Sequence, residues 1–448
     1  MKVGLVRPFY HTHLITPQLA LGYLSSYLRE AGYPTRIVDG LNEGLHPGDI
    51  VGRCADCELV GISALTDYFP EVITLSRALK AAGKTVVVGG PHATALPAAT
   101  LKESGADYVV VGEGEETLRE LAGALAAGGD PEKVAGVYGP RDRRAAGRDL
   151  IDDLNLLPFP DWERMDPRRY QKAPHGAFIK RFPVAPLMST RGCPFECSFC
   201  ASPFLWEKRI RFRSPENVVE EIEYLVRDFG VREIHFEDDN LTLRRSHIEE
   251  ICNLLIRRKL DISWAAPNGV RADTLDGGLL ELMKRSGCYM LAFGIESGNQ
   301  EILDRVSKET DLSAIRRAVA EAGRLGIVTQ GFFIFGLPGE TEETVAESVR
   351  FAKSSGLDRA QFLLLDPLPG SRLGEELAAG GDHRSRQRSY QQVAWCPPTV
   401  SPEFLERAPG RAFRSFFFRP RQLYRLVRMI RPGQLKYLVR RIRDFDIF

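Results

Sequence analysis

Short apolar runs alternate with amphipathic stretches along the first 140 residues of the chain. The apolar runs begin near residues 3, 35, 59, 85 and 107, and turn-forming residues bound them. The stretches that begin at Leu19 and Tyr68 carry apolar residues at helical spacing and end in glycine, which favours a helix end. Strands that alternate with helices predict a doubly wound parallel sheet, so this region is expected to be an α/β domain.

A strand-then-helix unit recurs about six times between Val184 and Gly370. In one unit, the stretch after residue 213 is amphipathic, and Ser214 suits its N-cap, Pro215 its first turn and Gly230 its end. The next strand runs into the acidic residues of REIHFEDDNLT. The repeated unit predicts a second parallel α/β sheet, with polar residues at the carboxyl ends of its strands.

Two segments lack this alternation. Residues 141–180 carry a charged stretch and then closely spaced prolines and aromatics, which indicates a linker. From Gly410 to Phe448 there are ten Arg and one Lys against two Asp. Basic and apolar residues fall on different faces of the expected helix in this second segment. It either lies on an anionic membrane surface or packs at the mouth of the second domain, with its arginines paired to acidic strand ends.

The composition is that of a globular protein with large cores, because 44% of the 448 residues are hydrophobic. A formal net charge of +1 argues against a partner that attracts the whole protein electrostatically, such as nucleic acid. Eight cysteines without a recognisable signal peptide predict a cytoplasmic protein with reduced thiols. The chain has no uncharged apolar run of about 18 residues, so no membrane span is expected.

Three cysteines in the stretch RGCPFECSFCAS carry the most specific chemical signal. Cys193, Cys197 and Cys200 have C-x3-C-x2-C spacing. Iron–sulfur clusters are commonly held by four thiolates, so three on one loop leave one iron of a [4Fe–4S] cube open to another ligand. A structural zinc site is the alternative, but zinc usually takes four N or S ligands, and no partner pair follows downstream. Cys54 and Cys57 form a lone C-x2-C pair in the first domain.

Polar and glycine-rich loops follow three predicted strands of the first domain. Doubly wound sheets bind ligands at the carboxyl ends of their strands, and glycine there lets the backbone approach a large flat ligand. Taken singly, each loop is also typical of an ordinary strand-to-helix turn. The candidate binding residues are Ser63, Thr66, Gly89, Gly90, Pro91, His92, Gly112, Glu113, Gly114, Glu115 and Thr117.

The cysteine triplet, with Phe199 directly before its third cysteine, resembles that of the radical S-adenosylmethionine (SAM) superfamily. The glycine loops as a set resemble the cobalamin-binding domain that precedes many radical SAM cores. The resemblance implies a doubly wound, Rossmann-like cobalamin-binding domain over 1–140 and a linker over 141–180. It further implies a partial (βα)6 TIM-type barrel over 181–375 and a basic helical region over 376–448. The implied cofactors are a [4Fe–4S] cluster, SAM and cobalamin.

The resemblance also assigns roles to the polar residues at the strand ends. The three cysteines bind the cluster, and its open iron takes the amino and carboxylate groups of SAM. Asp238 and Asp239 lie where the family often binds the SAM ammonium, and carboxylates suit a cation. Glu296 lies where the family commonly contacts the ribose, and Arg271 is placed to pair with the SAM carboxylate. Internal ion pairing among these charges is the alternative.

The cobalamin domain lacks one familiar motif. Mutase-type domains carry D-x-H-x-x-G, whose histidine ligates cobalt, and the motif is absent here. This absence resembles the radical SAM methylases, which hold cobalt without a protein histidine. His92 is the nearest candidate for a cobalt contact, and a loop histidine bonded within the protein is the alternative. A domain that kept the fold and lost the cofactor is a further alternative.

The resemblance as a whole implies a cobalamin-dependent radical SAM methyltransferase. It would methylate an unactivated carbon by way of a 5′-deoxyadenosyl radical and methylcobalamin. Two alternatives stay open: a related enzyme that forms or contracts rings, on a lipid or tetrapyrrole for example, without methyl transfer, and a non-catalytic cobalamin sensor or carrier. The expected partners are a small-molecule, peptide or lipid substrate and an external low-potential electron donor of the flavodoxin or ferredoxin type, with peripheral membrane contact through the basic region as an open question.

Overall fold

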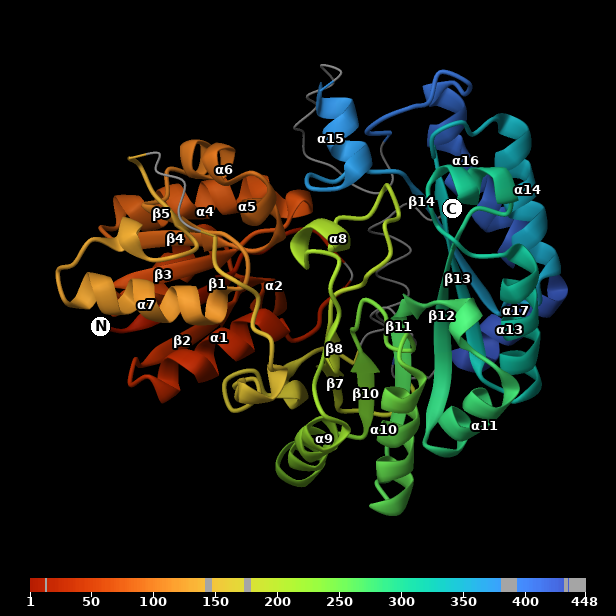
Figure 1. The fold of residues 1–448 in the computed structure, drawn as a ribbon, viewed down its shortest axis with the longest axis horizontal. Helices are drawn as coiled ribbons and strands as arrows, with labels where there is room; N and C mark the ends of the chain where they lie inside the picture. Colours follow the sequence, from red (N-terminus) through yellow and green to blue (C-terminus); the bar gives the residue numbers. More distant parts are fainter. Residues whose placement is uncertain (13, 142–146, 173–178, 380–392, 431–433, 435–448) are drawn as a thin grey trace. The chain divides into compact units, whose positions relative to one another are not determined.

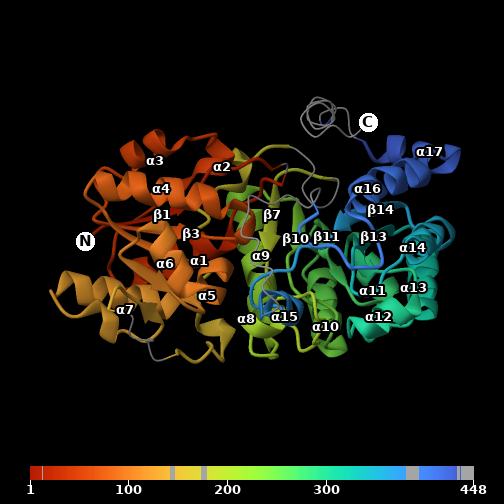
Figure 2. The ribbon, with the colours of Figure 1, turned by 90° about the horizontal axis from the view of Figure 1, so that it is seen from above.

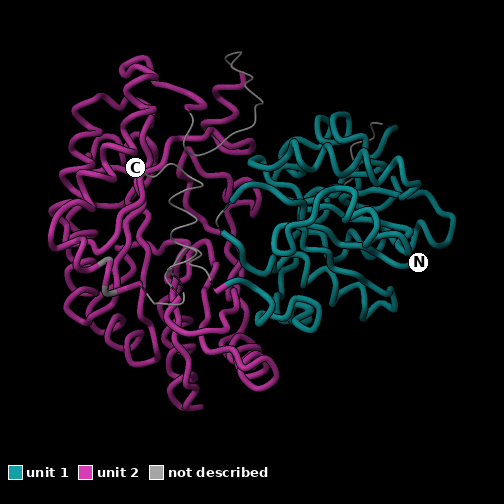
Figure 3. The backbone as a smooth tube through the Cα atoms, turned by 180° about the vertical axis from the view of Figure 1, so that it is seen from behind, with its two compact units in different colours: residues 1–171, 385–388 teal, residues 172–384, 389–448 magenta. Residues whose placement is uncertain are grey.

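The computed structural model describes residues 1–12, 14–141, 147–172, 179–379, 393–430 and 434. The described chain forms two compact units, one that comprises residues 1–171 and one that begins at Lys172 (Figure 3). The described residues of the predicted linker up to Gln171 therefore pack with the first unit.

The first unit is built on a six-stranded sheet with the strand order β2-β1-β3-β4-β5-β6. All neighbouring strands are parallel except β5 and β6, which pair antiparallel. The predicted doubly wound α/β domain is thereby confirmed, with a short antiparallel strand added at its edge. The strands are β1 (Val3–Arg7), β2 (Thr35–Asp39), β3 (Leu59–Ser63), β4 (Thr85–Gly89), β5 (Tyr108–Val110) and β6 (Val137–Tyr138).

Helices cover both faces of this sheet. Figure 2 shows α3 and α4 on one face and α1 and α7 on the other. The predicted helices after residues 18 and 67 are present as α1 and α4. The helices are α1 (Leu19–Glu30), α2 (Gly40–Glu43), α3 (Pro47–Arg53), α4 (Phe69–Ala81), α5 (Pro91–Ala95), α6 (Pro97–Ser104) and α7 (Gly114–Ala126), with 3-10 turns at Thr66–Tyr68, Pro131–Lys133, Leu154–Leu156 and Pro167–Arg169.

The C-x2-C pair of this unit lies in its core. Cys54 and Cys57 are both free thiols and almost completely buried, at 0% and 1% exposure. A Cβ added to Gly4 of β1 would lie 3.3 Å from either sulfur, so the missing side chain of this glycine makes room for the two thiols. The pair therefore packs beneath the sheet, at the end where β1 begins.

The second unit contains a six-stranded parallel sheet with the order β14-β13-β12-β11-β10-β7. Each strand is followed along the chain by a helix before the next strand, which is the predicted partial (βα)6 arrangement (Figure 1). A separate antiparallel pair, β8 and β9, follows β7. The strands are β7 (Val184–Leu187), β8 (Thr190–Arg191), β9 (Arg211–Phe212), β10 (Glu233–Phe236), β11 (Ser263–Val270), β12 (Cys288–Glu296), β13 (Val328–Phe335) and β14 (Arg359–Leu364).

Helix α9 of the second unit begins and ends where local signals predict. In α9 the Ser214 hydroxyl accepts a hydrogen bond from the backbone N–H of Asn217, and Gly230 ends the helix at a left-handed φ of 62°. The helices are α8 (Ser202–Leu205), α9 (Pro215–Phe229), α10 (Arg245–Arg257), α11 (Gly277–Arg285), α12 (Gln300–Arg305), α13 (Leu312–Arg324), α14 (Glu342–Ser354), α15 (Arg372–Ala379), α16 (Pro402–Phe417) and α17 (Pro420–Met429), with a 3-10 turn at Ala272–Thr274.

The C-terminal helices differ from their predicted position. Helix α16 packs along β14 and α14, and the Arg425 guanidinium of α17 pairs with the Asp358 carboxylate at 2.7 Å. Asp358 directly precedes β14, so this pairing is at the amino end of the strand and not at the carboxyl ends. No helix among the described residues is long and apolar enough to cross a membrane. The basic residues of 435–448 lie outside the described part of the chain.

Candidate functional site

The three cysteines lie on the loop between β8 and β9, after the carboxyl end of β7. Gly192 begins this loop with a φ of 100°, a conformation that favours glycine. A Cβ on Gly192 would lie 2.1 Å from the carbonyl oxygen of Arg209 and 2.9 Å from Cβ of Trp206. The start of the loop at Gly192 therefore packs directly against its end near Arg209. This contact restrains the segment that carries the cysteines.

The cysteine sulfurs already accept hydrogen bonds from the surrounding protein. Asn240 donates its side-chain amide to Sγ of Cys193 at 3.8 Å, and the backbone N–H of Ser202 donates to Sγ of Cys200 at 3.4 Å. All three thiols are free and partly exposed. Burial raises the pKa of Cys197, and that of Cys200 to about 12, so a positively charged metal centre would be needed to keep them as thiolates.

The spacing of the sulfurs bears on which metal centre they fit. No group of three or more His, Cys, Asp or Glu side chains in the described ranges is arranged to hold a single metal ion. In a [4Fe–4S] cube each thiolate binds a different iron, so the ligands of a cluster need not converge on one point. Three free thiols on one loop, two of them with an N–H group directed at the sulfur, fit a cluster with one open iron.

Asp238 anchors the start of this loop. Its carboxylate accepts hydrogen bonds from the hydroxyls of Ser189 and Thr190, each at 2.7 Å, and from the backbone N–H of Ser189 at 3.1 Å. Burial raises its pKa to about 6 although these bonds favour the charged form. Asp238 is thus engaged within the protein. Such an internal role was the alternative to SAM binding for the charged residues at the strand ends.

Asp239, the next residue, is in a different environment. The residue as a whole is exposed, but its carboxylate accepts a hydrogen bond from the hydroxyl of Ser202 at 3.2 Å, and burial among its neighbours raises the pKa of that carboxyl. Ser202 follows the third cysteine by two residues, so this carboxylate lies beside the cysteine loop. Of the two aspartates, Asp239 is the one that can offer an oxygen to a ligand.

Glu296 ends β12 in a conformation that a non-glycine residue rarely adopts, with a φ of 64°. Its carboxylate accepts a hydrogen bond from Nζ of Lys308 at 2.8 Å. A Cβ on Gly294 would lie 2.6 Å from the Glu296 carboxylate and 2.9 Å from the Lys308 ammonium, so this glycine leaves the space that the ion pair fills. An unusual backbone angle held in this way indicates a functional constraint.

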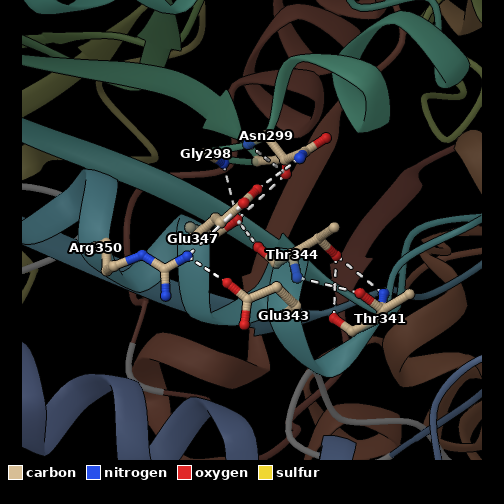
Figure 4. Close-up of polar contacts among 9 residues, drawn as sticks. Gly298, Asn299, Thr341, Glu343, Thr344, Glu347 and Arg350 are labelled. Carbon is tan, nitrogen blue, oxygen red and sulfur yellow. Dashed lines mark hydrogen bonds and ion pairs between the residues drawn. The ribbon is translucent and has the colours of Figure 1, made fainter.

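The loop after Glu296 is held against α14 (Figure 4). The backbone N–H of Gly298 donates to the Ser348 hydroxyl at 2.8 Å, and the Asn299 side chain donates to Glu347 at 2.6 Å. A Cβ on Gly298 would lie 2.6 Å from Cα of Ser348, so only glycine fits this approach. The helix start is fixed in turn by a reciprocal cap between Thr341 and Thr344.

The guanidinium of Arg271 is already engaged within the unit. It forms a two-pronged pair with Asp273, at 3.0 and 2.8 Å, and donates to the carbonyl oxygens of Lys308, at 2.9 Å, and Glu309. It also lies over the Phe195 ring, 3.6 Å from the centroid. Four of the five N–H donors of Arg271 are used on these protein groups, so at most one remains for a carboxylate such as that of SAM.

Two further features shape the same end of the sheet. Phe199 packs against a cluster that includes Leu337, the residue that follows Gly336 at the end of β13. Glu340 accepts hydrogen bonds from the backbone N–H groups of Gly336, at 2.6 Å, and Leu337, at 3.1 Å. Glu340 is fully buried, and burial raises its pKa to about 7. Its second carboxylate oxygen accepts no hydrogen bond from any described residue.

In the first unit the order in which strands are added reverses at β1. The chain places β2 on one side of β1 and then β3 on the other side. Such a switch point is where doubly wound sheets bind ligands. Ser63, at the end of β3, accepts a hydrogen bond from the Gln18 side chain at 2.8 Å. Beside them the rings of Tyr10 and Tyr68 stack with centroids 4.3 Å apart.

The loop after β4 carries the residues Gly89 to His92. Gly90 has a φ of 108°, and a Cβ there would lie 2.8 Å from the carbonyl oxygen of Ala64, so the close approach requires glycine. Pro91 occupies the first turn of α5. His92 is buried, its Nδ1 lies 3.1 Å from the Thr66 hydroxyl, and its ring stacks on Phe69 at 3.9 Å. The imidazole of His92 is thus held by contacts within the unit.

The loop after β5 is more open. Gly112 has a φ of 80° and nothing within 4 Å of an added Cβ. Glu113 accepts a hydrogen bond from the backbone N–H of Ile151 at 2.7 Å, and Thr117 accepts one from Arg148 at 3.0 Å. Glu115 and Thr117 are buried, and Gly114 begins α7. In this loop the backbone at Gly112, more than the acidic side chains, is available to a ligand.

Several residues of these sites carried no sequence signal that drew attention to them. Asn240 follows the acidic run directly, and its position two residues after Asp238 could have included it. Lys308 lies in a polar turn without periodic pattern, and only the fold brings it beside Glu296. In the first unit Arg7 and Asp39, at the ends of β1 and β2, form a buried ion pair at 2.5 Å.

A cysteine loop beside a parallel strand–helix sheet, together with a doubly wound domain that has a glycine-rich ligand edge, defines the class of iron–sulfur proteins with a second, large cofactor. Family models agree: the Radical SAM superfamily matches residues 187–352, and the B12 binding domain matches residues 11–122. The chain belongs to the cobalamin-binding radical SAM enzymes, and a [4Fe–4S] cluster, SAM and cobalamin are the cofactors of this family.

Similar proteins support this assignment along nearly the whole chain. The chain is 33% identical over 420 residues to the uncharacterized methyltransferase PH0819 of Pyrococcus horikoshii, which covers 91% of this chain and 89% of that protein. It is 31% identical over 428 residues to the anaerobic magnesium-protoporphyrin IX monomethyl ester cyclase of Rubrivivax gelatinosus, covering 91% of this chain and 75% of that protein.

The fold also matches a solved structure. The radical S-adenosylmethionine methyltransferase TsrM from Kitasatospora setae, with cobalamin and a [4Fe–4S] cluster bound, superimposes with a TM-score of 0.72 at 21% identity. The match covers 97% of this chain and 92% of that chain. At this identity the likeness establishes the shared fold of both units, and the role of each residue rests on its own contacts.

Proposed function

We propose that this protein is a cobalamin-dependent radical SAM methyltransferase that methylates an unactivated carbon. The observation that carries the proposal is the match with a protein named as a methyltransferase over 91% of this chain and 89% of that protein, together with a site whose thiols fit a cluster with one open iron. Members of the radical SAM superfamily need a reductant, and we propose an external donor of the flavodoxin or ferredoxin type for this chain.

Cys193, Cys197 and Cys200 would hold the cluster. When bound, the cluster supplies the electron that cleaves SAM, and cobalamin supplies the transferable methyl group. The chain's own residues orient these groups: Asn240 and the backbone of Ser202 direct N–H groups at the sulfurs. Such hydrogen bonds stabilise thiolate ligands and tune a cluster.

Asp239 and Glu296 are the proposed contacts of SAM. The carboxylate of Asp239 offers an acceptor to the ammonium beside the cysteine loop, and the strained backbone of Glu296 directs its carboxylate towards the same end of the sheet. Asp238 and Arg271 support the site indirectly, since Asp238 anchors the loop and Arg271 is engaged by Asp273 and two carbonyls. Phe199 packs behind the loop.

Cobalamin would bind at the carboxyl end of the first unit's sheet. Glycine backbone at Gly89, Gly90 and Gly112, with the polar side chain of Ser63, forms an edge that suits a large flat ligand. Pro91, Thr66 and Gly114 shape the loops, whereas His92, Glu113, Glu115 and Thr117 are held in internal contacts or buried positions. The site would thus hold cobalt without a histidine ligand.

A ring-forming reaction is the second candidate, because a cyclase is 31% identical to this chain. The two functions differ in what they make from SAM. Methyl transfer through cobalamin produces S-adenosylhomocysteine, whereas radical chemistry without methyl transfer cleaves SAM to 5′-deoxyadenosine and methionine and produces no S-adenosylhomocysteine.

The test is to purify the protein without oxygen, reconstitute the cluster and cobalamin, and add SAM with a low-potential reductant. We expect S-adenosylhomocysteine in an amount that matches the bound cobalamin, and 5′-deoxyadenosine besides. 5′-deoxyadenosine without S-adenosylhomocysteine would favour the ring-forming reaction. If a protein loaded with both cofactors releases neither product, with SAM alone and with candidate acceptors, a non-catalytic carrier is the better description.

A further inference from the structure

Lys308 lies in an enclosed position that the proposed roles of the strand-end residues do not use. Its side chain is 12% exposed and its partner, the side chain of Glu296, is 9% exposed, and their charged atoms are 2.8 Å apart. The missing side chain of Gly294 leaves the space in which both groups lie. Enclosing a lysine to this extent costs free energy, because burial disfavours the ammonium, and the charge must be offset by a partner such as Glu296.

The chain adopts an unusual turn to place this lysine. Ser307 has a φ of 55° and Glu309 a φ of 50°, so both neighbours of Lys308 have left-handed backbone conformations that non-glycine residues rarely adopt. Two such residues around one lysine are costly, and the surrounding contacts must hold them. The strain indicates that the position of Lys308 is specified.

Arg271 is the residue that holds the turn. It donates to the backbone carbonyl oxygens of Lys308, at 2.9 Å, and of Glu309, while Asp273 fixes the same guanidinium through two hydrogen bonds. An arginine fork that meets two carbonyls and one carboxylate has little freedom to move, whereas a lysine could not make this set of bonds.

The same contacts tie the turn to the cysteine loop. The Arg271 guanidinium lies 3.6 Å from the centroid of the Phe195 ring, which is two residues before Cys197. The backbone N–H of Ser198, the residue after that cysteine, donates to the carbonyl oxygen of Val306 at 2.9 Å. The loop and the lysine turn are therefore joined at two points, on either side of Cys197.

The turn brings Lys308 to the neighbourhood of Cys197. Val306, whose carbonyl oxygen accepts the hydrogen bond from the residue after Cys197, precedes Lys308 by two residues. The ammonium of Lys308 is held 2.8 Å from the Glu296 carboxylate, so its position is fixed on this side of the cysteine loop.

We propose that Lys308 is a fixed positive charge that raises the reduction potential of the cluster, and that Arg271 is the positioning residue that holds it there. The inference rests on the proposed binding of the cluster by the cysteine loop. The potential of an iron–sulfur cluster depends on nearby charge and on hydrogen bonds to its sulfurs. A positive charge beside one ligand favours the reduced cluster, which carries one more negative charge.

The test is a redox titration of the reconstituted cluster, followed by its electron paramagnetic resonance signal, in the absence of SAM. We expect Lys308→Met to shift the midpoint to a more negative potential and Lys308→Arg to return most of it. Glu296→Gln removes the negative partner of Lys308 and should shift the midpoint in the opposite direction. Lys353→Met removes an exposed positive charge of α14 and serves as the matched control.

The variants of Arg271 test its role as a positioning residue. Arg271→Lys keeps the charge and loses the fork, so it should shift the midpoint in the same direction as Arg271→Leu. A midpoint for Arg271→Lys equal to that of the wild type would overturn the positioning role. Equal midpoints for Lys308→Met, Lys353→Met and the wild type would overturn the charge role.

The iron and sulfide contents separate this inference from the proposed function. A wild-type protein that takes up no cluster contradicts the proposed function itself. Variants that take up the full cluster and keep the wild-type midpoint contradict only the inference. If Lys308→Met fails to take up a cluster, Glu296→Gln still decides, because the expected shift for that variant has the opposite sign.

Discussion

Both units of this protein have candidate ligand-binding residues at the carboxyl ends of a parallel sheet. In one unit these ends present side chains, and in the other they present mainly backbone. In the second unit the edge consists of side chains that bond to one another across strands, such as Asp238 with Ser189 and Glu296 with Lys308. In the first unit it consists largely of glycine backbone, and the ion pair of Arg7 and Asp39 at the ends of β1 and β2 is buried.

The difference suits the ligands expected at each edge. A metal cluster and a charged small molecule need fixed charges and hydrogen bonds at defined points, which side chains supply. A large flat ring needs close approach over a wide area, which backbone without Cβ atoms permits. The comparison can therefore be tested by changing charged side chains in one unit and glycines in the other.

The largest effect is expected for the cysteine loop. Cys200→Ala should lose the cluster and with it all cleavage of SAM, because two thiolates on this loop cannot hold a cube that three would hold. The iron content and the release of 5′-deoxyadenosine measure both losses. Cys252→Ala removes a fully buried thiol of α10 and should retain the cluster. Equal iron content in the two variants would contradict the assignment.

The next effect concerns the buried carboxylate of Glu340, whose pKa burial raises to about 7. The pKa of Glu340 is higher in the folded than in the unfolded protein, so between these two pKa values the native state binds more protons. Stability therefore falls as the pH rises from about 5 to 8. The cost is up to roughly 3 kcal/mol at 1.36 kcal/mol per pKa unit. Glu340→Gln should remove this dependence in denaturation series at several pH values.

The matched control for that series is Glu342→Gln, at an exposed position in the first turn of α14. It should leave the pH dependence of the wild type in place. A wild-type protein whose stability is flat between pH 5 and 8 would mean that the Glu340 carboxylate is better solvated than its burial indicates.

Close backbone packing in the second unit is tested by Gly298→Ala. The added Cβ would lie 2.6 Å from Cα of Ser348 and 2.7 Å from Cβ of Phe351, so the loop after Glu296 must move. Overpacking of this kind costs about 1–3 kcal/mol. Gly323→Ala in α13 has nothing within 4 Å and should instead stabilise the helix, by about 0.5–1 kcal/mol. Urea denaturation compares the two, and a similar loss for both would contradict the packing argument.

The glycines of the first unit can be ranked in the same way. A side chain at either Gly90 or Gly112 is forced into a left-handed conformation, at about 1–2 kcal/mol. Only at Gly90 would the Cβ also meet the carbonyl oxygen of Ala64, at 2.8 Å. Gly90→Ala should therefore lower stability and cobalamin binding more than Gly112→Ala, as followed by thermal unfolding and the absorbance of bound cobalamin. The reverse order would place the ligand nearer to β5 than to β4.

The smallest effect is expected for Tyr170, whose neutral hydroxyl contacts the buried ion pair of Arg7 and Asp39. The Tyr170 hydroxyl donates to the Asp39 carboxylate at 2.7 Å. Tyr170→Phe should cost about 1 kcal/mol, the usual contribution of one such hydrogen bond, and leave cobalamin binding unchanged. Tyr108→Phe on β5 is the control in denaturation. A marked loss of cobalamin from Tyr170→Phe would show that the ion pair belongs to the ligand edge.

Much of the fold could be read from local patterns. The N-cap and the end of the helix from Pro215 to Phe229 were predicted from the sequence. The apolar runs near residues 3, 35, 59 and 85 are four neighbouring parallel strands in the structure. These features depend on periodicity and on the conformational preferences of serine, proline and glycine, which act within a few residues. The position of α17 could not be read in this way, because its partner Asp358 is remote in the sequence.

The residues of the candidate site divide along the same line. The three cysteines, the acidic run after β10 and the glycine loops could be recognised without a structure, because each is a short motif with its own chemistry. The folded arrangement was needed to show that Asp238 and Arg271 are engaged within the protein, that Asp239 lies beside the cysteine loop, and that Lys308 pairs with Glu296. The physical reason is that a charge acts on its neighbours in space, and here those neighbours come from different strands and turns of the chain.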